Sequence, residues 1–104
     1  MTNPKKPTPA VNVEVTRYEV SCLRPDQREY KNYKILVERY RDGLWFAHDG
    51  LMRLAADGEW VESRGLDHLH DEETALRLAR QAAPHLTCNG HTVAEALSEG
   101  GDRG

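Results

Sequence analysis

The residues that could bind a metal ion or act as a nucleophile are concentrated near the end of the chain. Cys88 and His91 flank an Asn-Gly pair, so a tight turn there would bring their side chains together. His68 and His70 alternate in an extended segment and would share a face. A zinc site needs about four such ligands, usually in paired CxxC or HxxxH motifs, and this sequence has neither. We therefore expect no metal site and no cofactor.

Catalytic patterns are equally weak. A cysteine nucleophile needs a histidine base and an orienting group, and Cys88, His91 and Asn89 supply these residue types. The three crowd one turn, whereas nucleophile and base in known sites usually come from distant segments that hold each in place. Glu72 and Glu73 are adjacent on an expected helix and point in different directions. The sequence predicts no catalytic residue and no enzymatic activity.

Basic residues of the first half are the candidates for nucleic-acid contacts. Residues 1–53 hold ten Lys and Arg against seven Asp and Glu, while residues 54–104 hold four against ten. Glutamates interleave with the cations on the same expected strands, which favours cross-strand ion pairs on a solvated face. Mimicry of nucleic acid by the acidic half is a further hypothesis that rests only on its charge. For DNA or RNA binding, the candidate residues are Arg17, Lys34, Arg39, Arg41 and Arg53.

The aromatic residues all fall within the expected sheet. A single helix can cover only one face of a sheet, so some rings must lie on the other face or at an edge. Exposed Trp and Tyr, together with Arg, are typical of interface centres. An exposed sheet edge offers a second route, which is self-association by strand pairing. We expect a protein partner or a second copy of the chain to bind through Tyr33, Tyr40, Trp45 and Trp60.

The alternation of apolar and polar residues predicts strands in the first two thirds of the chain. Strand-like sequence begins at about Ala10 with three alternating valines, and the alternation slips by one residue near Thr16 and Arg17. Further strands are expected over 30–40 and 44–47, followed by two shorter ones. Three Asp-Gly pairs separate the short apolar runs, so the strands should form a meander of hairpins.

The hydrophobic period then changes to that of a helix over 72–83. Its apolar residues recur at i, i+3 and i+4, and Asp71 stands at the N-cap position. Beyond it, the Asn-Gly pair predicts a small hairpin. Thr92 and Glu95 have the spacing of a capping box, so a short helix should run over 93–98.

Together these elements predict a single α+β domain over residues 10–98. It should be an antiparallel β-meander of four to five strands with one principal helix packed on one face, closed by a short C-terminal hairpin and helical turn. Residues 1–9 and 99–104 should be flexible tails. With no apolar run near the ~18 residues that cross a bilayer, we expect a cytoplasmic protein without membrane contact. On the sheet side, the expected core is Val13, Val20, Ile35, Val37, Phe46, Leu54 and Val61.

Two resemblances bear on function. The order of strands and then a helix resembles the arm-binding domains of phage-type integrases and plant AP2 domains, which implies a sheet that binds the DNA major groove. Four short sequences also resemble small uncharacterised proteins of actinobacteria and their phages, a family that brings no known activity. We expect a non-enzymatic, protein-binding interaction module of phage or mobile-element context, with DNA binding as the alternative. The four sequences are Asp57-Gly-Glu-Trp60, Thr74-Ala-Leu-Arg-Leu-Ala79, Ala83-Pro84 and Asn89-Gly-His-Thr-Val93.

Overall fold

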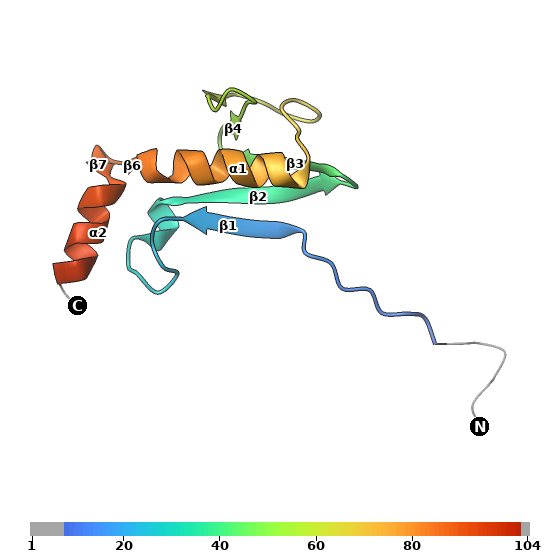
Figure 1. Cartoon of the computed structure of the whole chain (residues 1–104), viewed down its shortest axis with the longest axis horizontal. Helices are drawn as coiled ribbons and strands as arrows, with labels where there is room; N and C mark the ends of the chain where they lie inside the picture. The colour runs from blue at the N-terminus through green and yellow to red at the C-terminus, as the bar shows by residue number, and fades with distance from the viewer. Residues whose placement is uncertain (1–7, 103–104) are drawn as a thin grey trace.

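The computed structural model describes the backbone of residues 8–102 and the side chains of residues 8–98. Its centre is a five-stranded antiparallel sheet in which the order of strands follows the chain (Figure 1). The α+β class and the meander expected from the sequence are therefore confirmed. The strands are β1 (Arg17–Ser21), β2 (Lys34–Arg41), β3 (Leu44–His48), β4 (Arg53–Leu54) and β5 (Trp60–Val61).

Tight turns join the strands where the sequence has Asp-Gly pairs. Gly43 joins β2 to β3 with a φ of +74°, a left-handed conformation that glycine adopts without strain. Gly58 does the same between β4 and β5 with a φ of +87°. The β2–β3 register shifts between Arg39 and Arg41, which leaves Tyr40 at a bulge. The turns thus set the meander, and the bulge redirects the end of β2.

Helix α1 (Glu72–Ala82) packs across one face of the sheet (Figure 1). Asp71 caps it, because its carboxylate accepts a hydrogen bond from the Thr74 backbone N–H at 2.7 Å. A single 3₁₀ turn, η2 (Ala83–His85), follows the helix at Pro84. Between the helix and the sheet lies the main core, formed by Ile35, Val37, Trp45, Ala47, Leu54, Ala75, Leu78, Ala79 and Ala83.

The strands turn alternate residues toward α1 and away from it. Trp45 and Ala47 of β3 are buried against the helix, so Phe46 between them points to the other side. Val61 pairs with Arg53, and the next pair in the register is Leu54 with Trp60. Because Leu54 belongs to the main core, alternation turns Arg53 and Val61 to the other side. The expectation that Phe46 and Val61 belong to the main core is therefore wrong. We call the side of the sheet opposite α1 the open face.

A second, smaller core lies at the C-terminal end of the domain. The hairpin β6 (Thr87–Cys88) and β7 (His91–Thr92) leads into helix α2 (Val93–Asp102). The capping box is present, since the Thr92 N–H donates to the Glu95 carboxylate and the Glu95 N–H donates to the Thr92 hydroxyl. With the 3₁₀ turn η1 (Tyr30–Asn32), this unit encloses a cluster made of Leu23, Tyr33, Val93 and Ala96.

The ends of the domain differ from the sequence expectations. The first strand begins at Arg17 and not at Ala10, and residues 8–16 run outward from the body as an extended segment (Figure 1). Val13, expected in the core, is 89% exposed because β2 turns back before it can pair with this part of the chain. At the other end, α2 continues to Asp102. The expected tails fall largely on residues 1–7 and 103–104, which lie outside the described residues.

Candidate partner-binding face

A group of rings occupies the open face near the end of the β2–β3 hairpin. The Phe46 ring lies 5.0 Å from the His48 ring and 6.5 Å from the Tyr40 ring, measured between centroids. Phe46 and His48 stand two residues apart on β3 and therefore share a face. Tyr40 joins them from the bulge of β2 and leaves 44% of its surface exposed. We call Tyr40, Phe46 and His48 the aromatic patch.

Arg53 of β4 borders the aromatic patch beside the Phe46 ring. Its guanidinium carbon lies 4.3 Å from the centroid of the Phe46 ring, within the range of a cation–π contact. The same guanidinium donates hydrogen bonds to the backbone carbonyls of Gly65 and Asp67, at 2.8 and 2.7 Å. Arg53 thereby ties the loop before α1 to the patch, using two of its five N–H donors.

Polar partners orient the other members. The His48 Nε2 atom is hydrogen-bonded to the Glu38 carboxylate, whose residue pairs with Phe46 in the sheet register. The Arg41 guanidinium lies 5.9 Å from the centroid of the Tyr40 ring. The patch therefore combines exposed ring area with a carboxylate and two guanidinium groups at its border. Such a mixture suits the recognition of a protein surface.

The four residues that the sequence assigned to a partner surface lie in different environments. Only Tyr40 lies on the open face with a large exposed fraction. Tyr33 and Trp45 are 3% and 5% exposed, in the smaller and the main core respectively. Trp60 is half-buried and packs against the main core. Trp45 and Trp60 do not belong to the candidate surface, because strand alternation turns them toward the main core. Tyr33, which follows η1, is excluded because it is buried in the smaller core.

Phe46 and His48 lie on the open face, partly exposed, although the sequence did not single them out for a partner surface. The available signal was the alternation of β3, in which Trp45 and Phe46 must point to opposite sides. Because Trp45 and Ala47 are buried, alternation places Phe46 and His48 on the open face. The sequence did not show which of the two faces α1 would cover.

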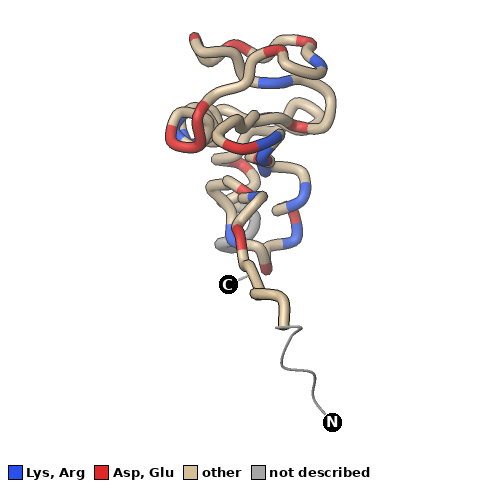
Figure 2. The backbone as a smooth tube through the Cα atoms, turned by 90° about the vertical axis from the view of Figure 1, so that its right-hand side faces the viewer, with Lys and Arg blue, Asp and Glu red and all other residues tan. Residues whose placement is uncertain are grey.

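The cations named for nucleic-acid binding are mostly engaged with other groups. Arg17 and Lys34 both contact the Glu19 carboxylate, at 3.3 and 3.1 Å. Hydrogen bonds from the Tyr30 hydroxyl and from Lys34 hold the pKa of Glu19 below its usual value, so the carboxylate remains charged near neutral pH. Arg39 is paired with Glu14. Figure 2 shows acidic and basic positions interspersed over the backbone.

The Arg39 and Arg41 side chains have different surroundings. Arg39 is paired with Glu14 and lies near the start of α1, whereas Arg41 lies beside the Tyr40 ring. Among the five cations named from the sequence, Arg41 is the one for which the described residues offer no carboxylate or carbonyl partner. A phosphate-tracking surface needs several free cations side by side. Four of these five cations are already paired, so the five do not form one.

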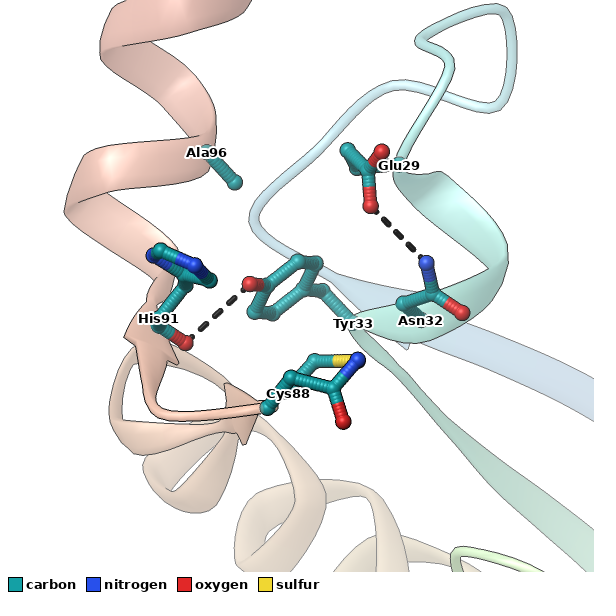
Figure 3. Close-up of a pocket in the computed structure, with 7 residues that line it drawn as sticks. Glu29, Asn32, Tyr33, Cys88, His91 and Ala96 are labelled. Atoms are coloured by element: carbon teal, nitrogen blue, oxygen red, sulfur yellow. Dashed lines mark hydrogen bonds between the residues drawn. The ribbon is translucent and has the colours of Figure 1, made fainter.

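A small pocket separates η1 from the C-terminal hairpin (Figure 3). The Tyr33 side chain reaches across the pocket, and its hydroxyl donates a hydrogen bond to the His91 backbone carbonyl at 3.1 Å. On the η1 side of the pocket, the Asn32 amide donates to the Glu29 carboxylate. Cys88 lines the same pocket as a free thiol. Its volume of about 140 Å³ is well below the roughly 300 Å³ at which ligand pockets begin. The pocket is best described as a gap between two packed units.

Within residues 8–98, no group of three or more His, Cys, Asp or Glu side chains is placed to hold a metal ion. Neither of the two α-helices in the described chain has the length and apolar character needed to cross a membrane.

The fold and this surface define a class: a small α+β protein whose antiparallel sheet is covered by a helix on one side and carries an aromatic patch on the other. No protein-family model, curated protein sequence or solved structure matches the chain. The resemblances noted from the sequence, to DNA-binding sheet domains and to actinobacterial and phage proteins, stay predictions.

Proposed function

We propose that this chain is a non-enzymatic interaction module that binds a protein through the aromatic patch of its open face. The observation that carries the proposal is the cluster of Tyr40, Phe46 and His48 on the sheet face opposite α1. Aromatic rings bordered by arginine supply large contact area at low entropic cost and dominate binding energy in protein interfaces. The resemblance to proteins of actinobacteria and their phages supports a mobile-element setting inside the cell for this partner.

Charge favours a protein over a nucleic acid as the partner. The open face carries Glu19 and Glu38 among its cations, and Glu19 neutralises two of them directly. Nucleic acid would have to displace these carboxylates, and the repulsion between them and the phosphates would remain. A protein surface can instead pair with both signs of charge around a central apolar contact.

The proposal predicts that a photo-crosslinker at position 40 captures one protein from a lysate of the source organism. Replacing Tyr40 with p-benzoylphenylalanine keeps an aromatic ring at the exposed edge of the patch. The expected result is a discrete adduct, identified by mass spectrometry. Excess wild-type chain should compete with its formation, because both would occupy the same partner surface, and excess Phe46→Ala chain should compete much less.

The matched control carries the same crosslinker at Arg77, an exposed position on α1 at the covered side of the sheet. An adduct of equal yield at position 77, or competition that is equally strong with Phe46→Ala, would contradict binding through the patch. The Phe46→Ala chain must keep the far-ultraviolet circular dichroism spectrum of the parent chain for this comparison.

The same reasoning predicts no measurable binding to a mixed-sequence DNA duplex, even at low salt. Fluorescence anisotropy at low and moderate salt is the direct measurement. Low salt is the most favourable condition for electrostatic binding, since the release of counterions then contributes most. Binding that weakens steeply as salt is added would instead support the DNA-binding alternative and count against a protein partner as the main ligand.

A further inference from the structure

The extended segment before β1 has the sequence of a strand, but none of the described strands of its own chain lies beside it. We call residues 10–16 the arm. Val11 and Val13 are each 89% exposed and Val15 is 58% exposed, and polar residues alternate with them. Figure 1 shows the arm leading from β1 away from the body of the domain. Alternating β-branched residues favour a paired strand, so exposed valines at this spacing are unexpected in a segment without a partner strand.

The base of the arm is held in line with the sheet. The Arg39 backbone N–H donates to the Thr16 carbonyl at 2.9 Å, which continues the β1–β2 ladder by one pair. The Arg39 guanidinium also holds the Glu14 carboxylate. Beyond this point β2 ends and turns into β3 at Gly43. The arm is therefore aimed along the strand direction but extends past the end of its own sheet.

The outer edge of β1 is free in the described residues, since β1 is the first strand in the sheet order. Proteins usually protect such edges with charged side chains, especially lysine, with proline or with a bulge. The sequence from Ala10 to Ser21 contains neither proline nor lysine, and the β1–β2 register is regular throughout. Because Thr16 points its carbonyl toward β2, the odd-numbered residues of β1 present their N–H and C=O groups to the free edge.

We propose that the arm of one chain pairs antiparallel with the β1 edge of a second copy, and that the exchange is reciprocal. Val11 then lies opposite Ser21 of the second copy, Val13 opposite its Glu19, and Val15 opposite its Arg17, with the two-fold axis at Thr16. Every odd-numbered residue from 11 to 21 meets another odd-numbered residue, so the outward N–H and C=O groups of both strands match. The two sheets join into one.

The sequence itself selects this register over its neighbours. A shift of one residue pair in one direction sets Arg17 opposite Arg17 of the second copy, which like charge disfavours. A shift in the other direction sets Ser21 opposite Pro9, which has no N–H to donate. A second copy is therefore a better occupant of the edge than an unrelated strand, because the complementary strand is already part of this chain.

The two-fold axis stands perpendicular to the joined sheet, so the open faces of both copies lie on the same side. The valines of the two arms extend that face between the two copies. Dimerisation does not depend on the aromatic patch, and the patch does not depend on dimerisation. Failure of one proposal therefore leaves the other standing.

The test measures the mass of the full chain by sedimentation equilibrium over a wide range of concentration, for wild type and for Val13→Pro. Wild type is expected to form a dimer. Val13→Pro removes one outward N–H from each copy and should raise the dimer dissociation constant more than about tenfold. The melting temperature extrapolated to low concentration should not change, because Val13 is outside the folded body. Val13→Thr, which keeps the N–H and the β-branched shape, should dimerise like wild type.

An engineered disulfide tests which residues of the two copies lie opposite each other. In a chain whose Cys22 and Cys88 are replaced by Ser, Thr16→Cys should form an intermolecular disulfide under mild oxidation faster than Val11→Cys does. The two copies of residue 16 face each other as a non-hydrogen-bonded pair, the closer type of pair in an antiparallel ladder. A wild-type chain that is monomeric at every concentration, a dimer unaffected by Val13→Pro, or equal crosslinking at both positions would overturn the proposal.

Discussion

Replacing Trp45 with Ala should destabilise the domain by about 3–5 kcal/mol, the usual cost of truncating a buried large aromatic residue. Trp45 is 5% exposed, lies within the main core and has its ring centroid 5.5 Å from that of Tyr18. A domain of this size is typically stable by about 5–15 kcal/mol, so the loss would remove a large part of the total. Urea unfolding followed by far-ultraviolet circular dichroism measures it directly.

Tyr40→Ala is the control for this result. Tyr40 belongs to the same hairpin and is also aromatic, but it is 44% exposed on the open face. Its truncation should cost less than about 1 kcal/mol, because little buried contact is lost. If Tyr40→Ala were as destabilising as Trp45→Ala, the ring at position 40 would be a core residue and the proposed binding face would lose its exposed member.

The second large effect is expected at Ile35. This side chain is fully buried between β2 and α1, and Ile35→Ala should cost about 2–5 kcal/mol, from lost apolar burial and the cavity left behind. Its neighbour Leu36 lies on the open face and is only half-buried. Leu36→Ala removes a side chain of equal size from the adjacent position, and it should cost about 1 kcal/mol.

The comparison of these two variants tests whether one face of the sheet is open. Both are measured by the same urea unfolding experiment, with the slope against denaturant concentration compared to verify that the same transition is observed. Equal losses at Ile35 and Leu36 would mean that a second layer covers the open face. In that case the aromatic patch would be part of a core, and the partner-binding proposal would fail with it.

Local sequence chemistry predicted much of the fold. The Asp-Gly pairs specify tight turns because glycine adopts a positive φ at no steric cost, and Gly43 and Gly58 do so here. Asp71 and the spacing of Thr92 and Glu95 mark helix starts, because their side chains satisfy backbone N–H groups that a helix leaves unpaired. These signals act within a few residues, so a single sequence is enough to show them.

The candidate site was harder to predict than the fold. The sequence showed that all the aromatic residues fall within the expected sheet, but Trp45 and Phe46 are adjacent and both strongly apolar. Which of them faces the helix depends on where α1 packs, and α1 is far from β3 in the sequence. Without that contact, the sequence favours a surface position for Trp45 and a core position for Phe46. Tyr33 is buried by a different distant contact, with Val93 and Ala96 of α2.

For the arm, too, the sequence shows the local pattern and the tertiary structure decides the contacts. Its alternating valines alone determined that residues 10–16 have strand character, because period-2 alternation is a local property. Only the tertiary structure decided that none of the described strands lies beside them, since the length of β2 and its turn at Gly43 determine where the sheet ends. Turns, caps and strand character thus follow from local interactions. The covered face, the cluster of rings on the open face and the position of the arm beyond the sheet follow from contacts between distant segments, which local sequence patterns do not specify.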